Sequence, residues 1–321
     1  MTIPIVLVAG FLGAGKTTLV NGLLRDPGGR RIAAIVNDFG AIDIDAELLG
    51  QAADGIVSLR NGCICCSLGG DLLRTLSTLL RRVPAPDAIV IETSGAADPA
   101  EIVRSLLDPA IHAEMPLDTV VTLVDARHLA DRPALFDDPL WRSQVAAADL
   151  CLLAKTDLVA ADELGRVREG LARRKPRHLT FDVTDGAFPP DLLFFGFDHP
   201  AAAPDPRRTR VASERFASLS WTSPRPLSLG RFQAAIGRLA PALVRAKGFV
   251  TFEDRAEQPM LFQLVGTRAT IVSRAAPAET GLAARLVLIG EIGRLDPAAA
   301  TALLDETMQR PPGGRSAPST A

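Results

Sequence analysis

The sequence predicts an α/β fold: a doubly wound, mostly parallel sheet, followed by a second, smaller α+β domain. Three observations support this prediction. Short apolar runs alternate with helical patterns through the first half of the chain. A glycine-rich loop follows the first of these runs, and the alternation fades near residue 197. Alternating strands and helices of this kind are typical of a parallel sheet covered by helices.

The strand candidates are near-continuous apolar runs, as expected for strands buried on both faces of a parallel sheet. They cover residues 3–9, 31–37, 87–93, 118–126 and 149–157. Helical patterns occupy the stretches between them or after them, at 16–26, 66–82, 99–108 and 160–174. In the last stretch Leu164, Val167 and Leu171 recur at helical spacing, which predicts an amphipathic helix.

A change of pattern divides the chain. Residues 1–197 form the first predicted domain, and 198–212, rich in Ala, Pro and Arg, read as a linker. Residues 213–295 predict the second domain, with a strand at 216–223 and, within 227–252, a helix, a break near Pro241 and another strand. Two further strand patterns follow. Residues 296–321 predict a C-terminal helix and a disordered tail.

The composition excludes several classes of protein. With 47% hydrophobic and 22% charged residues the chain is globular, and its net charge of −2 provides no strong field for nucleic acid. A short basic run at 173–177 is interpreted as a solvated helix end. No apolar run reaches the length of a membrane span, and no signal peptide precedes the first strand. We therefore expect a soluble, cytoplasmic protein in which clustered cysteines serve metal binding or catalysis.

The glycine-rich loop at residues 10–17, GFLGAGKT, matches G-x-x-x-x-G-K-[ST] between an apolar strand and a helical stretch. In such a loop backbone amides and the helix N-terminus surround phosphates. Lys16 is expected to reach the β- and γ-phosphates, and the Thr17 hydroxyl to ligate Mg²⁺. The loop therefore predicts a nucleoside triphosphate site.

Two further motifs follow buried strands. In ETSG (92–95), Glu92 is placed to sense Mg²⁺ and the Gly95 amide to sense the γ-phosphate. AKTD (154–157) is similar to the guanine-reading N-K-x-D motif, with Ala154 in place of Asn. Because Lys155 and Asp157 remain, GTP is favoured over ATP.

Three cysteines, Cys63, Cys65 and Cys66, stand within four positions. In an extended segment Cys63 and Cys65 would face the same side, and Cys66 would join them at a turn. Such thiolates suit Zn²⁺ or a similar thiophilic metal, with a fourth ligand from elsewhere. A redox dithiol and a buried turn remain as alternatives. Cys151, inside a strand pattern, is predicted to be a core residue, and the four scattered histidines (His112, His128, His178 and His199) to be structural or exposed.

Together, GFLGAGKTT, NDFG (37–40), NGCICCSLGGDL (61–72), ETSGAADP (92–99) and AKTDL (154–158) resemble the CobW family of P-loop GTPases, many of which are metallochaperones. RPLSLGRFQ and VRAKGF resemble the C-terminal domain of that family. Asp38 and Ala41 stand where the family commonly has glutamates.

The resemblance implies a GTP-hydrolysing metallochaperone with slow intrinsic turnover, using GTP, Mg²⁺ and Zn²⁺, with Co²⁺ possible. The candidate catalytic residues are Lys16, Glu92 and Asp38. The candidate nucleotide-binding residues are Gly10, Gly13, Ala14, Gly15, Lys16, Thr17, Thr18, Gly95, Lys155 and Asp157. The candidate metal ligands are Thr17 for Mg²⁺, and Cys63, Cys65 and Cys66 for zinc.

Control of the cysteine site by the nucleotide is the mechanistic hypothesis. GTP with Mg²⁺ would order the cysteine segment, and hydrolysis would release the metal to a client metalloprotein. Two other functions stay open: an accessory protein of cobalamin biosynthesis or cobalt insertion, acting with a cofactor-biosynthesis enzyme, and a nucleotide-binding regulator with little turnover. Assembly into a homo-oligomer is also open.

Overall fold

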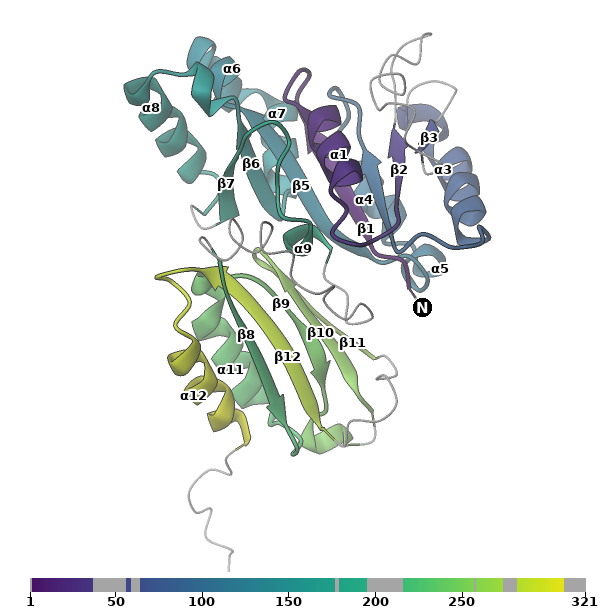
Figure 1. Ribbon diagram of the computed structural model, residues 1–321, viewed down its shortest axis with the longest axis vertical. Helices are drawn as coiled ribbons and strands as arrows, with labels where there is room; N and C mark the ends of the chain where they lie inside the picture. The colour runs from purple at the N-terminus through teal and green to yellow at the C-terminus, as the bar shows by residue number, and fades with distance from the viewer. Residues whose placement is uncertain are drawn as a thin grey trace, which may run out of the picture. The chain divides into compact units, whose positions relative to one another are not determined.

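The computed structural model describes residues 2–36, 56–58, 64–176, 179–194, 216–256, 258–273 and 282–308. For residues 56–58, 64–71 and 110 it describes the backbone alone. The chain divides into two compact units, Met1–Pro206 and Arg207–Ala321 (Figure 1). The predicted linker at 198–212 and the predicted tail at 309–321 lie outside the described residues.

The first unit is built on a parallel sheet of seven strands in the order β3-β2-β4-β1-β5-β6-β7. The strands are β1 (Ile5–Gly10), β2 (Ile32–Val36), β3 (Ile56–Ser58), β4 (Ala88–Glu92), β5 (Leu117–Asp125), β6 (Leu150–Ala154) and β7 (Thr180–Val183). β1, β2, β4 and β6 are buried along their whole length, which explains why their sequences are apolar without alternation.

Helices cover both faces of this sheet, with α1 in front and α4 and α7 behind in the view of Figure 1. The helices are α1 (Lys16–Arg25), α3 (Ile64–Leu80), α4 (Pro99–Leu106), α5 (Pro109–His112), α6 (Ala126–Asp131), α7 (Pro139–Ala147), α8 (Ala161–Ala172) and α9 (Pro190–Leu193), with 3₁₀ turns η1 (Pro133–Asp137) and η2 (Thr156–Leu158). The prediction of a doubly wound parallel sheet is therefore confirmed.

Two apolar clusters hold these layers together. One joins α3 and α4 to strands β1, β2 and β4, through residues such as Leu76, Ile102 and Leu7. The other joins α6, α7 and α8 to β5 and β6, and it contains Cys151. Burial raises the pKa of the Cys151 thiol from 9.0 to about 12, partly opposed by the positive charge of Lys175. The thiol therefore stays protonated, and the prediction that Cys151 is a core residue is confirmed.

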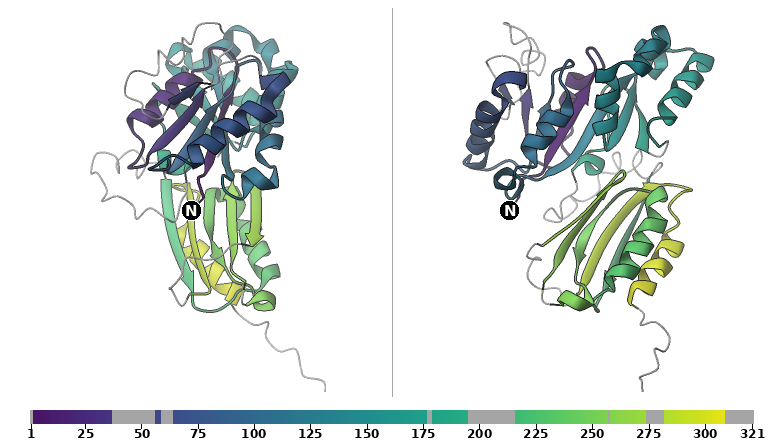
Figure 2. Two further views of the ribbon diagram at one scale, coloured as in Figure 1. Left: turned by 90° about the vertical axis from the view of Figure 1, so that its right-hand side faces the viewer. Right: turned by 180° about the vertical axis from the view of Figure 1, so that it is seen from behind.

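The second unit is an antiparallel sheet in the order β11-β10-β9-β12-β8. Its elements are β8 (Phe216–Ser223), α11 (Leu229–Leu239), η4 (Ala240–Ala242), β9 (Leu243–Val250), η5 (Glu253–Arg255), β10 (Met260–Val265), β11 (Arg268–Ser273), β12 (Ala284–Glu291), α12 (Pro297–Asp305) and η6 (Glu306–Met308). Helices α11 and α12 cover one face of the sheet (Figure 2). Their shared core includes Phe232, Leu286 and Leu304.

The interpretation of the basic run at 173–177 as a solvated helix end is wrong for two of its members. Lys175 is 7% exposed, and its ammonium donates to the carbonyl oxygen of Ala148. The Arg174 guanidinium lies 4.9 Å from the ring centroid of Phe136 and donates to Asp137 at 3.2 Å. These side chains satisfy a buried carbonyl and cover an aromatic ring, so they belong to the packing of the first unit.

Candidate nucleotide site

The sheet order brings the predicted nucleotide motifs to one edge. β1 lies between β4 and β5, and β6 lies next to β5. Because these strands are parallel, their carboxyl ends meet at the same edge, which is where ligands bind in open α/β sheets. The glycine-rich loop follows β1, Glu92 ends β4, and Lys155 follows β6.

The loop after β1 turns directly into α1. Gly10 has a φ of +144°, and a Cβ there would come within 2.5 Å of the Leu123 carbonyl oxygen, so only glycine fits beside β5. Gly15, in a left-handed conformation, caps α1. Ala14 is buried, while Gly13 and Thr18 are exposed. The N-terminus of α1 therefore lies directly after β1 at this edge of the sheet, as a phosphate cradle requires.

Lys16 and Thr17 begin this helix. Lys16 is 8% exposed, and its Nζ donates to the Phe11 carbonyl oxygen at 3.2 Å. The ammonium therefore lies against the backbone near the start of the loop. Thr17 Oγ1 donates to Glu92 Oε1 at 2.9 Å. The ammonium of Lys16, held beside the loop, is suited to bind phosphate oxygens.

The Thr17 hydroxyl and the Glu92 carboxylate, 75 positions apart in the sequence, thus meet at the end of β4. Glu92 is 4% exposed. Hard oxygen donors of this kind, held near a phosphate cradle, fit Mg²⁺. Asp38, the third candidate catalytic residue, lies outside the described residues.

The segment after Glu92 packs against the phosphate loop. A Cβ on Gly95 would lie 2.7 Å from both the Cα and the N of Leu12, so glycine allows the two backbones to touch. The Thr93 amide donates to the Val8 carbonyl oxygen at 2.9 Å, which extends the pairing of β4 with β1. The predicted γ-phosphate sensor and the loop are therefore in direct contact.

Lys155 connects the base-reading motif to the phosphate loop. Its Nζ donates to the Gly13 carbonyl oxygen at 2.8 Å and to Asp125 Oδ2 at 2.7 Å. The other oxygen of Asp125 accepts from the His128 amide and caps α6. Asp157 is exposed in η2. Lys155, which follows Ala154 at the end of β6, thus connects the ends of β5 and β6 to the phosphate loop after β1.

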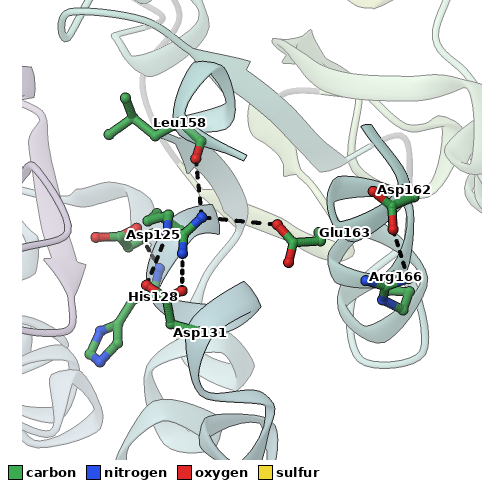
Figure 3. A network of polar contacts seen from close by, with 8 residues as sticks. Asp125, His128, Asp131, Leu158, Asp162, Glu163 and Arg166 are labelled. Carbon is green, nitrogen blue, oxygen red and sulfur yellow. Dashed lines mark hydrogen bonds and ion pairs between the residues drawn. The ribbon is translucent and has the colours of Figure 1, made fainter. Parts of the chain in front are cut away.

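A network of polar contacts lies between α6, η2 and α8 (Figure 3). Arg127, on α6, donates to both carboxylate oxygens of Asp131 and to the Leu158 carbonyl oxygen at 3.4 Å, and it lies 3.9 Å from Glu163 on α8. The hydrogen bonds that the Arg127 guanidinium donates to Asp131 raise the pKa of Arg127, which stays cationic. This network connects α6, η2 and α8 on the base-reading side of the site.

Sequence reasoning missed Asp125 and Gln144. Asp125 is a carboxylate directly at the end of an apolar run, the same signal that identified Glu92. Gln144, fully buried in α7, donates to the Gly95 and Ala97 carbonyl oxygens. A lone amide in a helix gave no signal, because its acceptors lie 47 and 49 positions away in the sequence.

The predicted metal ligands are only partly described. Cys63 lies outside the described residues, and Cys65 and Cys66 lie in the first turn of α3, described in backbone alone. The extended geometry assumed for Cys65 is wrong, because the helix begins at Ile64, two residues earlier than expected. Among the side chains that the structure describes, no group of three His, Cys, Asp or Glu is placed to hold a metal ion. His178 and His199 also lie outside the described residues.

The fold and these contacts define a P-loop nucleotide-binding protein. Residues 4–181 match the family described as "CobW/HypB/UreG, nucleotide-binding domain". Residues 216–308 match "Cobalamin synthesis protein cobW C-terminal domain". The chain belongs to the CobW/HypB/UreG family, as its motifs predicted.

Curated relatives agree with this assignment. "Zinc chaperone YjiA" of Escherichia coli K12 is 34% identical, over 81% of this chain and 85% of that protein. "Zinc chaperone CobW" of a Sinorhizobium species is 39% identical, over 56% of this chain, and the match spans only 58% of the relative. "Zinc-regulated GTPase metalloprotein activator 1" of Schizosaccharomyces pombe is 32% identical, over 53% of this chain and 43% of that protein.

Among solved structures, the Zn(II)-bound YjiA GTPase of E. coli is 26% identical over 96% of this chain and all of that chain, with a TM-score of 0.43. None of the helices in the described part of the chain has the length and apolar character that crossing a bilayer requires.

Proposed function

We propose that the protein is a GTPase that binds zinc through Cys63, Cys65 and Cys66 and delivers it to a client protein under nucleotide control. The convergence of Lys16, Thr17 and Glu92 at one edge of the sheet carries the nucleotide part of this proposal. The relatives named zinc chaperones support zinc as the cargo.

The phosphate end of the site performs the reaction. Lys16 would bind the β- and γ-phosphates, and Thr17 and Glu92 would hold Mg²⁺, whose charge neutralises the phosphate oxygens. The Gly95 amide would donate to the γ-phosphate. Water attacks the γ-phosphorus, the bond to the β-phosphate oxygen breaks, and GDP and phosphate are the products. Slow intrinsic turnover is expected of a nucleotide switch of this kind.

The base end selects the nucleotide. Asp157 would accept from the two guanine nitrogen donors, while the Lys155 stem would pack on the ring. The hydrogen bond of Lys155 to Gly13 supports this assignment, since it places the base-reading residue against the phosphate loop. We therefore propose GTP, rather than ATP, as the substrate.

The proposed metal site follows β3 in the sequence. β3 pairs in parallel with β2, with Ser58 beside Val36. The carboxyl end of β3, five residues before Cys63 in the sequence, therefore lies at the same edge of the sheet that carries the phosphate loop. This placement supports coupling between the γ-phosphate and the cysteines. Delivery of the metal to a client protein and assembly into a homo-oligomer are further parts of the proposal.

A second candidate function is an accessory role in cobalamin biosynthesis or cobalt insertion. The match of residues 216–308 to a domain described from cobalamin synthesis favours it. Thiolate ligands accept Co²⁺ as well as Zn²⁺, so metal preference is the discriminating measurement. A regulator with little turnover would differ from both by showing no stimulation by a client.

A spectroscopic Co²⁺ titration with Zn²⁺ competition tests the proposal. Protein loaded with Mg²⁺ and a non-hydrolysable GTP analogue is compared with protein loaded with GDP. We expect thiolate–metal bands and tighter binding in the GTP form, both lost in Cys63→Ser and Cys65→Ser. Cys151→Ala is the matched control, because that thiol is buried and protonated. Equal affinity in both nucleotide states would contradict nucleotide control.

A further inference from the structure

Gln144 is a buried polar residue that the proposed reaction does not use. It lies on α7 with none of its surface exposed. Its Nε2 is 3.2 Å from the Gly95 carbonyl oxygen and 3.2 Å from the Ala97 carbonyl oxygen. Burial of an amide in an apolar environment is unfavourable unless it is hydrogen-bonded, so this side chain has a defined set of partners.

The orientation of the amide follows from its neighbours. Both are carbonyl oxygens, which only accept, so the NH₂ group must face them. Gln144 Oε1 is buried and has no hydrogen-bond partner among the described residues. Both donors of the side chain are therefore directed at one segment, while its acceptor is left unsatisfied. An apolar side chain would avoid that penalty, so packing alone does not explain the residue.

The segment at residues 93–98 is held from several sides. Gly95 touches the backbone of Leu12 in the phosphate loop. At the end of the segment, the Asp98 carboxylate caps α4 and accepts from Ser143 Oγ at 2.6 Å. Ser143 and Gln144 are neighbours on α7, so this helix and the phosphate loop enclose the segment between them.

α7 itself is fixed to the sheet. Thr122 Oγ1, in β5, donates to the Gln144 carbonyl oxygen at 2.8 Å, and both groups are buried. The carboxyl end of the same strand carries Asp125, which binds Lys155. The side-chain amide of Gln144 is therefore held in place, and it fixes the two peptide groups that carry the Gly95 and Ala97 carbonyl oxygens.

We propose that Gln144 is a positioning residue. By fixing the carbonyl groups of Gly95 and Ala97 it restricts the backbone torsions of Gly95, holds the Gly95 amide toward the γ-phosphate and so distinguishes GTP from GDP. This inference rests on the proposed function. GDP has no γ-phosphate, so the two hydrogen bonds of Gln144 matter for GTP and not for GDP. Their loss leaves the carbonyl side of Gly95 unfixed, so the torsions that direct the Gly95 amide are less restricted and GTP must order them on binding.

Two variants test the inference. Gln144→Met has a similar length and removes both hydrogen bonds. Gln144→Glu keeps the shape but replaces the donors by a carboxyl group. For each, affinities for GDP and for a non-hydrolysable GTP analogue are measured, with kcat and KM for GTP. We expect the preference for the GTP analogue over GDP, and kcat, to fall about tenfold in Gln144→Met, with GDP affinity almost unchanged.

Thr122→Val is the matched control. It removes the hydrogen bond to the main chain of Gln144 but leaves the side chain and its two acceptors intact. We expect a lower Tm with the same preference for the GTP analogue. A structural role of α7 alone would give the opposite pattern, with selectivity falling in step with Tm in every variant.

The Gln144→Glu variant adds a pH signature. A carboxylate facing two carbonyl oxygens is repelled, and burial also raises the pKa of a carboxyl group. In its neutral form the group donates one hydrogen bond. Lowering the pH from about 8 to about 6 should therefore restore part of the GTP preference in Gln144→Glu and not in Gln144→Met.

The outcomes separate the two proposals. If the wild type prefers GTP and hydrolyses it, but all variants keep that preference, the inference about Gln144 is wrong and the proposed function stands. If the wild type neither binds nor hydrolyses GTP, the proposed function is wrong and the inference fails with it. Selective loss of GTP preference, partly reversed by acid in the glutamate variant alone, supports the inference.

Discussion

The two ends of the nucleotide site are built from different kinds of polar contact. At the phosphate end, Lys16 and Glu92 are 8% and 4% exposed. At the base-reading end, the side chains of Lys155 and Arg127 are 39% and 44% exposed. Solvent weakens the second set of contacts and hardly reaches the first.

This difference in exposure suggests that the two ends of the site have different roles. Buried groups at strand ends cannot move without disturbing the sheet, so they can hold charge in a fixed geometry for chemistry. Exposed ion pairs add little stability, but they leave the base-reading turn free to admit a ligand. We therefore expect substitutions at the phosphate end to have large effects and those at the base end small ones.

Lys16→Ala should produce the largest effect. The variant removes the only lysine of the loop, and with it the cation proposed to bind the β- and γ-phosphates. GTP turnover should fall by about 10² to 10³, in line with other removals of a charge-stabilising group from an active site. Initial rates of phosphate release measure this directly. A loss below tenfold would mean that the phosphate end does not depend on its buried cation.

Gly95→Ala should have the next largest effect. The new Cβ would lie 2.7 Å from the Leu12 backbone, so one of the two segments must shift. Overpacking of this kind costs about 1–3 kcal/mol of unfolding free energy, and turnover should fall with it. Gly165→Ala in α8 is the control, because a Cβ there meets nothing within 4 Å. It should stabilise the helix by about 0.5–1 kcal/mol, as measured by urea unfolding.

The contrast between the two ends also shows what sequence can predict. The five long strands were predicted because each is a continuous apolar run, and their order in the chain placed Lys16, Glu92 and Lys155 at a common edge. β3 and β7 were missed because they have only three and four residues. α7 was also missed, although Asp138 before Pro139 is a helix start that the sequence displays.

Contacts between distant residues could not be predicted. The hydrogen bond of Lys155 to Asp125 depends on the pairing of β5 with β6, and that of Gln144 to Gly95 depends on where α7 packs. Burial is equally a property of the fold: Lys175 reads as a surface cation in the sequence, yet it lies against the buried end of α7. The pattern of residue types predicts elements, whereas tertiary packing decides their partners.

Lys155→Met sharpens the comparison. The variant keeps an apolar stem for the base ring but removes the bonds to Gly13 and Asp125. Because both contacts are partly exposed, we expect affinity to fall about tenfold or less, and equally for GTP and GDP. Asp125→Asn should have a smaller effect, since Asn still caps α6. A loss of affinity for GTP alone would mean that Lys155 acts on the γ-phosphate rather than on the base.

Arg127→Ala should have the smallest effect, although Arg127 makes more polar contacts than Lys155 at the base-reading end (Figure 3). Its partners Asp131 and Glu163 are themselves exposed, and its bond to the Leu158 carbonyl oxygen is long, at 3.4 Å. We expect GTP and GDP affinities to change by about threefold or less, with the wild-type advantage vanishing at high salt. Fluorescent-nucleotide titrations at low and high salt measure this. A loss above tenfold that persists at high salt would break the comparison, because an exposed network would then control η2 as firmly as buried groups control the phosphate loop.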